Sequence, residues 1–420
     1  MTGLLDGIRV FDMTLAAVGP WASKLLGELG ADVIKVESPE PEMSHQIPPK
    51  IKGTGVLYIS ANFNKRQIVL DLKNDDERAK AYRLAEHCDV FIQNMRPGAA
   101  EKLGFGYHDI VAMRPDVIYV TASAYGRVGP MSTEGGVDPL LQAFCGWTSI
   151  MGPEGSQGEM FRHFAHLDIT TSSNIVEAVL QALVHRERTG QGQHIEIEMI
   201  TAALALQSTR LSEYFVSGQQ PTPLGSAVAT SVPHQAFACQ DREWLAVGLT
   251  HDNQWPSFCR AIHLDELAVD PRYVTNAGRV QQRNELVSVL AERFATKPAT
   301  WWAHRLTTAG VANSRIQDFD VLRHHPQVLD NHHLEYLETP HFGHLYVDAV
   351  PWDFEATPAG PIVAGGLQGE HSDEIRAEFG LDNTVGLDNT VGLDTLYAVG
   401  DPAGPAGAQA GAAATDGSDR

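Results

Sequence analysis

Short apolar segments alternate with helix-like segments along the first part of the chain. The apolar segments are rich in Val and Ile, whereas the segments between them repeat apolar residues at helical spacing. The expected strands cover residues 8–12, 32–37, 68–72, 90–93 and 117–122, and the expected helices cover residues 21–29, 76–87 and 109–113. Alternation of this kind is typical of a parallel sheet with helices on both faces, so we expect an α/β fold with a Rossmann-like large domain.

A longer helix is expected after Asp168, because Ile175, Val179 and Ala182 recur at helical spacing. Asp168 itself precedes a run of hydroxyl residues, 170–173 (TTSS). A carboxylate at a helix start lies near free backbone N–H groups and the positive end of the helix dipole, which favour its ionised form. An ionised carboxylate held in this way can act as a nucleophile. The alternative is that Asp168 only caps the helix.

The composition narrows the class of protein. The chain has 420 residues, 43% of them hydrophobic and 20% charged, which is enough for large cores in two domains. Its formal net charge of −21 works against nucleic acid or an anionic membrane surface as a partner. Any anionic ligand must be held by a few local Lys or Arg residues and by helix N-termini.

The four cysteines lie far apart with no C-x-x-C pair, so we expect neither disulfides nor a metal site. The first residues lack the pattern of a signal peptide, and no uncharged stretch approaches membrane-spanning length. We therefore expect a cytoplasmic protein without a membrane partner.

The Rossmann-like pattern suggests dinucleotide binding as one possible function. Glu37 ends the second expected strand, where an acidic residue would bind the ribose. The turn after the first strand, residues 12–20 (DMTLAAVGP), has neither three spaced glycines nor a P-loop. We therefore do not expect NAD or ATP to bind, and we interpret Glu37 as structural.

The remaining chain divides into further parts. Residues 237–249 have strand-like patterns, and residues 255–262 and 279–294 have helix-like patterns, which together indicate a smaller α+β domain. The hexapeptide GLDNTV occurs at 380–385 and again at 386–391, too short a unit for a solenoid, and the Ala, Gly and Pro content from residue 401 is typical of a disordered tail. The expected parts are a large domain over 1–200, a linker over 201–220, the small domain over 221–312, a return segment over 313–380, and the repeat with its tail over 381–420.

Several motifs in order along the chain carry a resemblance to a known family. They are residues 5–10 (LDGIRV), 27–37 (GELGADVIKVE), 62–66 (NFNKR), 70–73 (LDLK), 94–98 (NMRPG), 103–107 (LGFGY), 124–126 (AYG), 168–193 and 369–372 (GEHS). The sequence resembles the family III CoA-transferases, of the formyl-CoA transferase and carnitine CoA-transferase type, a group that also includes the alpha-methylacyl-CoA racemases.

The resemblance implies that Asp168 is the catalytic carboxylate of an acyl-CoA:carboxylate CoA-transferase. It would attack a donor acyl-CoA to give an aspartyl anhydride, and an aspartyl-CoA thioester would follow. Backbone N–H groups near Asp168 are the expected donors to the oxyanion. The substrates would be an acyl-CoA and a carboxylic acid, with coenzyme A as substrate and no cofactor or metal. The positions that match the family's CoA-binding residues are Ala17, Leu70, Lys73, Asn94, Met95 and Lys102, and Arg96 is a further candidate.

The sequence departs from the family pattern at several positions. Ala17 stands where a Gln contacts CoA, and Ser38 stands where some members have Arg. Residues 225–234 (GSAVATSVPH) replace the glycine-rich loop of formyl-CoA transferases, which makes oxalate a poor candidate for the acceptor. The identity of the acceptor and of the donor acyl group stays open.

Two other functions remain as alternatives. The racemase branch pairs its aspartate with a histidine in a Gly-His-Asp motif, and Val137 of this chain, in Gly136-Val137-Asp138, cannot transfer a proton. His163 and His166 lie close in sequence and could in principle substitute. The second alternative is a catalytically silent CoA-binding homologue. The family resemblance further implies that residues 340–343 and 369–371 rejoin the large domain, and that two chains form an interlocked homodimer.

Overall fold

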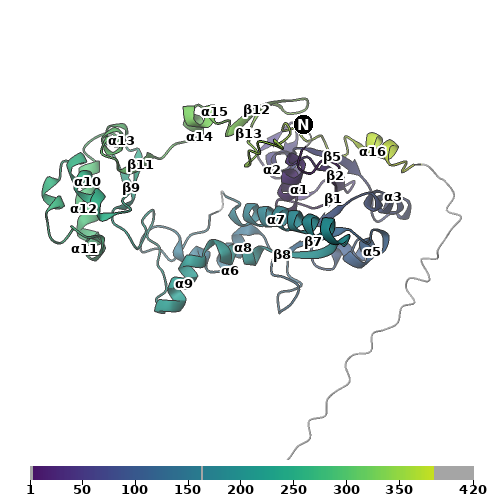
Figure 1. The fold of residues 1–420 in the computed structure, drawn as a ribbon, viewed down its shortest axis with the longest axis horizontal. Helices are drawn as coiled ribbons and strands as arrows, with labels where there is room; N and C mark the ends of the chain where they lie inside the picture. The colour runs from purple at the N-terminus through teal and green to yellow at the C-terminus, as the bar shows by residue number, and fades with distance from the viewer. Residues whose placement is uncertain (1–2, 162–163, 383–420) are drawn as a thin grey trace, which may run out of the picture. The chain divides into compact units, whose positions relative to one another are not determined.

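The centre of the fold is a six-stranded parallel sheet (Figure 1). A computed structural model describes residues 3–161 and 164–382. The strand order is β5-β2-β1-β6-β7-β8, which is the 3-2-1-4-5-6 order of a Rossmann fold. The direction of winding changes between β1 and β6, and ligands of such sheets bind outside the carboxyl ends of the strands at that point. The strands are β1 (Arg9–Met13), β2 (Asp32–Glu37), β5 (Lys65–Val69), β6 (Val90–Gln93), β7 (Ile118–Ser123) and β8 (Gln193–Glu198).

Helices cover both faces of this sheet, as the sequence predicts. On one face, α1 (Val18–Glu28) and α7 (His166–Thr189) pack with Val10 and Val120 in a single core. On the other face, α3 (Asp75–Glu86) and α5 (Tyr107–Met113) pack over the remaining side chains of the same strands. The α/β class is therefore confirmed.

Two strands differ from the expectation. The pattern predicts a strand over 68–72, but β5 begins at Lys65 and ends at Val69. Lys65 and Gln67 are polar and nevertheless buried, and the charge of Lys65 is compensated by the buried Asp12. The strand β8 was not predicted, since its polar sequence QHIEIE resembles an exposed segment. It is an edge strand that pairs only with β7 among the described strands, and edge strands keep polar side chains.

A second, antiparallel sheet has its own core. It contains β9 (His234–Ala238), β10 (Trp244–Gly248) and β11 (Ala312–Arg315), so it crosses the boundary predicted at residue 312. Helices α10 (Trp255–Ala261), α11 (Asn276–Gln281), α12 (Arg283–Phe294) and α13 (Ala299–Thr308) accompany it. The helix predicted over 279–294 is thus two helices that meet at Gln282.

Residues near the end of the described chain return to the first core. Ile375 of α16 (Ser372–Glu378) is fully buried in the same core as α3 and α5. Arg66 of β5 pairs with Glu374 and Glu378 of this helix. The second copy of the repeat and the predicted tail lie outside the described residues. The other helices and strands are β3 (Lys50–Ile51), β4 (Thr54–Gly55), α2 (Val56–Ala61), α4 (Ala99–Lys102), α6 (Asp138–Phe144), α8 (Met199–Leu206), α9 (Ser208–Ser217), α14 (Phe319–Arg323), α15 (Pro326–Asp330), β12 (Leu334–Thr339) and β13 (Gly343–Asp348), with short 3-10 turns at Met43–His45, Trp147–Ile150, Asp252–Gln254 and Asp265–Ala268.

Two general predictions can be compared with the described residues. All four cysteines are unpaired, and Cys88, Cys239 and Cys259 are buried. Within residues 3–161 and 164–382, every helix is too short or too polar to cross a lipid bilayer.

Candidate active site

A cavity of about 560 Å³ lies at the point where the winding of the sheet changes direction. The turn after β1, the segment after β6 and the end of β7 form part of its wall. Residues 133–138 and Asp168 of α7 complete it. The cavity therefore combines the expected ligand position of a Rossmann-like sheet with the carboxylate singled out in the sequence.

Asp138 holds the N-terminus of α7. This residue is 4% exposed, and its Oδ2 accepts hydrogen bonds from the backbone N–H of Leu167 at 2.7 Å and of Asp168 at 3.2 Å. Gln142 donates to the other carboxylate oxygen. Asp168 lies in the first helical turn, and the N-cap position of α7 is occupied by Ala165. The capping interpretation of Asp168 is therefore wrong, since Asp138 satisfies these N–H groups.

The electrostatic expectation for Asp168 is also wrong. Burial, and then the negative charge of Asp138, raise the pKa of Asp168 from 3.8 to about 7. The N–H groups that were expected to favour the ionised form instead bind the carboxylate of Asp138, which adds a like charge. Asp168 is thus a carboxylate that water stabilises poorly and that changes its charge near neutral pH.

The backbone N–H groups nearest to Asp168 are already occupied. Those of Leu167 and Asp168 bind Asp138, and that of Ile169 donates to the carbonyl of Ala165 at 2.9 Å. These three groups are therefore not free to stabilise an oxyanion in this structure, contrary to the expectation from sequence.

The turn between β1 and α1 borders the cavity and is bound at successive residues. Asn94 accepts from the N–H of Leu15 and donates to its carbonyl, both at 2.8 Å. Ala16 has a φ of 64°, in the left-handed region, and its N–H donates to Glu42 Oε2 at 2.6 Å. Lys35 Nζ donates to the carbonyl of Thr14 at 2.8 Å. These contacts hold a strained turn in one conformation.

A buried cluster of charged residues, Asp12, Lys35 and Lys65, contacts the start of this turn. Asp12 accepts from Lys65 Nζ at 3.0 Å and from the backbone N–H of Thr14 at 2.9 Å. Burial raises the pKa of Asp12, but Lys65, Lys35 and the hydroxyls of Ser23 and Thr14 outweigh it and lower that pKa to about 2. Asp12 is therefore ionised at neutral pH and fixes the start of the turn.

The structure brings together five of the eight residues predicted for the site. Ala17, Asn94, Met95, Arg96 and Asp168 all line the cavity. The side-chain amide of Asn94 is committed to Leu15, so its observed role is to hold the turn.

The other three predicted residues do not line this cavity. Leu70 is fully buried in the sheet core, which leaves no side-chain surface for a ligand. Lys73 is exposed in the connection after β5, and Lys102 is exposed at the end of α4. Their contacts with CoA stay predictions.

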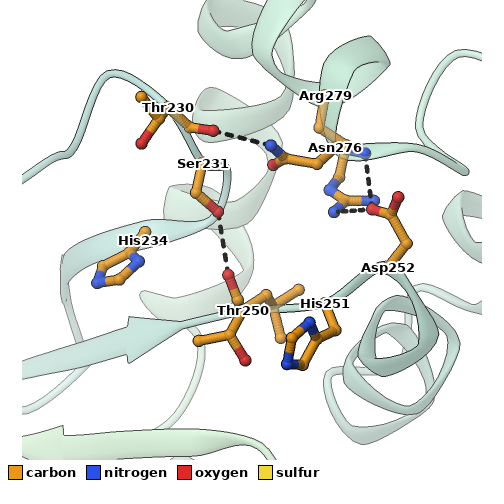
Figure 2. A pocket seen from close by; sticks show the side chains of 9 residues that line it. Thr230, Ser231, His234, Thr250, His251, Asp252, Asn276 and Arg279 are labelled. Carbon is orange, nitrogen blue, oxygen red and sulfur yellow. Dashed lines mark hydrogen bonds and ion pairs between the residues drawn. The ribbon is translucent and has the colours of Figure 1, made fainter.

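The segment that replaces the glycine-rich loop lies at a separate depression in the antiparallel-sheet domain, with a volume of about 460 Å³ (Figure 2). Figure 2 shows Asn276 beside Thr230, to whose carbonyl it donates at 2.8 Å, and Arg279 beside Asp252. Ser231 donates to the carbonyl of Leu249 at 3.0 Å. Arg283 also donates to the carbonyls of Val228 and Ala229, so several hydrogen bonds anchor the segment to its own domain.

Sequence reasoning missed two residues of the site. Asp138 was considered only as a neighbour of Val137, and Glu42 was not considered at all. A carboxylate thirty positions before Asp168 gives no local signal of a cap, because the contact exists only in the folded chain. Of the two histidines proposed near the site, His163 lies outside the described residues. His166 packs between Trp147 and two phenylalanines and does not line the cavity.

The fold and the cavity define an α/β protein with a half-buried carboxylate at a Rossmann-type ligand position, and comparisons with known proteins identify its family. CoA-transferase family III matches residues 5–372. The succinyl-CoA:glutarate CoA-transferase of Homo sapiens is 32% identical over 377 residues, covering 89% of this chain and 85% of the relative.

Two further comparisons agree. The succinyl-CoA–D-citramalate CoA-transferase of Chloroflexus aurantiacus is 28% identical over 378 residues, covering 88% of this chain and 92% of the relative. A crystal structure of a CAIB/BAIF family protein from Brucella suis has a TM-score of 0.82 and 27% identity, covering 90% of this chain and all of that one. The chain belongs to CoA-transferase family III and is a CoA-transferase.

Proposed function

We propose that this protein moves CoA between an acyl-CoA and a free carboxylic acid through covalent intermediates on Asp168. The observation that carries the proposal is the position of Asp168, a poorly hydrated carboxylate in a cavity at the point where sheets of this strand order bind ligands. A carboxylate deprived of water is a stronger nucleophile than one at the surface. The chemistry requires no metal or cofactor.

The transfer proceeds in four steps. An oxygen of ionised Asp168 attacks the thioester carbonyl, the C–S bond breaks, and CoA leaves as a thiolate from an acyl-aspartyl anhydride. The thiolate attacks the Asp168 carbonyl of the anhydride, which releases the donor acid and leaves an aspartyl-CoA thioester. The acceptor carboxylate then attacks this thioester, giving a second anhydride and thiolate. Finally, the thiolate attacks the acyl carbonyl of that anhydride and regenerates Asp168.

Dicarboxylic acids are the substrate class that we propose. The two relatives described above are named for succinyl-CoA as donor and for glutarate or D-citramalate as acceptor, and each of these acyl groups or acids ends in a second carboxylate. For this chain, the presence of an arginine in the wall of the cavity supports the same class, because guanidinium groups bind carboxylates in a bidentate manner.

We further propose that two chains form a homodimer and that the enzyme works in the cytoplasm. The dimer is an expectation of the family resemblance. Sedimentation at equilibrium tests it, since a monomer of 45.7 kDa at micromolar concentration would contradict it.

A steady-state assay tests the proposed reaction. The purified enzyme is mixed with succinyl-CoA and each of several acids, and new CoA thioesters are separated by chromatography. Transfer by the wild type, with none by Asp168→Ala, is expected. Exchange of an α-proton with deuterated solvent, without any transfer, would instead assign the protein to the racemase branch, and CoA binding without either reaction would identify a silent homologue.

A further inference from the structure

The cavity of Asp168 adjoins a second cavity of about 260 Å³, which we call the side cavity. The shared wall consists of Met95, Arg96, Pro97, Ser123 and Thr133. The side cavity extends toward β7 and β8, because residues of both strands line it. It therefore lies next to the position of the reacting groups, away from the β5 edge.

Most polar groups of the side cavity already have partners. Gln93 accepts from the N–H of Met95 at 2.9 Å and donates to Thr121 at 3.2 Å, and Thr121 contacts His194 at 2.9 Å. The cation of Arg127 is paired with Glu196 at 2.9 Å. The hydrogen-bonding capacity of these groups is largely used within the protein, so they have little left for a ligand.

Three side-chain hydrogen-bond donors of the side cavity differ from these groups. In residues 3–161 and 164–382, the guanidinium of Arg96 and the hydroxyls of Ser132 and Thr133 have no hydrogen bond or ion pair. A guanidinium with neighbouring hydroxyls is a donor set suited to a carboxylate.

We propose that the side cavity binds the distal carboxylate of dicarboxylic substrates through Arg96, assisted by Ser132 and Thr133. The inference rests on the proposed function, in which the donor acyl group and the acceptor acid occupy the same place in turn. One carboxylate site then serves both substrates. A volume of about 260 Å³ is several times the roughly 30 Å³ that one water occupies, so a carboxylate fits with its solvent.

One acidic residue in the side cavity opposes this binding. Glu101 lines the side cavity and is exposed, so its negative charge repels a bound carboxylate. The proposal therefore predicts effects of opposite sign for Arg96 and Glu101. A residue that only supports the fold would weaken the enzyme in both cases.

The test compares dicarboxylic substrates with monocarboxylic ones of equal length in the full-length enzyme. Arg96→Gln is expected to raise KM about tenfold or more for succinyl-CoA and glutarate, because a charge-assisted hydrogen bond is lost. The KM values for butyryl-CoA and valerate, which lack the second carboxylate, should stay within about twofold. Glu101→Gln should lower KM for succinyl-CoA and glutarate alone, about twofold or more.

A matched control removes one positive charge elsewhere. Arg323→Gln on α14 lines neither cavity and should change no KM more than about twofold. Equal rises for succinyl-CoA and butyryl-CoA in Arg96→Gln would overturn the proposal and assign Arg96 to the phosphates of CoA. Unchanged KM values would overturn it as well.

A binding measurement separates this inference from the proposed function. Calorimetry with glutarate and valerate needs no turnover, so it applies even to an enzyme that transfers no CoA. Tighter binding of glutarate than of valerate, lost in Arg96→Gln, is expected. Equal binding of the two acids by the wild type would contradict the side-cavity proposal, whatever the transfer assay shows.

Discussion

The raised pKa of Asp168 predicts that the neutral variant Asp168→Asn is more stable than the wild type, and increasingly so as the pH rises. A pKa of about 7 in the folded chain, against 3.8 for the unperturbed group, means that ionisation opposes folding. The folded state binds the extra proton between about pH 4 and pH 7, so the stability of the wild type falls across that range. The full difference is about 4 kcal/mol at 1.36 kcal/mol per pKa unit.

The size of the effect at two pH values follows from the same linkage. The variant should gain about 2 kcal/mol at pH 5, where the folded carboxyl is still protonated, and about 4 kcal/mol at pH 8. These are upper values, because the asparagine amide must also be accommodated in the cavity. The increase of the stability gain with pH is the decisive result, because an effect on packing alone would be the same at both pH values.

Urea unfolding of both proteins at pH 5 and pH 8 measures the difference directly. The control is Asp6→Asn, which changes an exposed aspartate outside the cavity and should alter stability by less than about 0.5 kcal/mol at either pH. A stabilisation by Asp168→Asn that is the same at both pH values, or that shrinks as the pH rises, would show that folding does not raise the pKa of Asp168.

Three further predictions concern the groups that hold the site. Asp138→Asn removes the like charge beside Asp168, so the pKa of Asp168 should fall and the rise of kcat/KM with pH should move to lower pH; an unmoved profile would show that burial alone sets this pKa. Asp138→Ala should lower the free energy of unfolding by about 1–3 kcal/mol, because two amides of α7 lose their acceptor, and urea unfolding measures this loss. Glu42→Ala should raise KM for acyl-CoA about tenfold by releasing the turn at Ala16, whereas Glu42→Gln, which keeps an acceptor oxygen, should change it less than about threefold. Equal effects of both substitutions would exclude the hydrogen bond as the cause.

Patterns of apolar residues predict the sheet well but fail where polar residues are buried. The bounds of β2 and β6 agree with the expectation, because their Val and Ile side chains have no alternative to the core. The start of β5 could not be predicted, since burial of Lys65 depends on Asp12, fifty-three positions earlier. The strand β8 could not be predicted because it is an edge strand, and an edge strand tolerates polar residues that give no apolar pattern.

In the candidate site, too, some features could be predicted from the sequence and others depend on long-range contacts. Asp168 was singled out from its sequence context, and the structure places it in the wall of one cavity with Ala17, Asn94, Met95 and Arg96. The charge state of Asp168 could not be predicted, because it depends on burial and on the approach of Asp138 in three dimensions.

Other features of the site also arise only in the folded chain. The amide of Asn94 is committed to Leu15, and Glu42 binds the turn at Ala16 from another loop. Contacts of this kind determine which predicted residues remain free for substrate.

The covalent role of Asp168 is best tested by intact mass spectrometry of the enzyme after mixing with acyl-CoA and trapping with borohydride or hydroxylamine. We expect a modification that maps to Asp168 with succinyl-CoA and is absent in Asp168→Ala. A wild-type enzyme that turns over while Asp168 stays unmodified, or an adduct that persists in Asp168→Ala, would contradict the covalent role of this carboxylate.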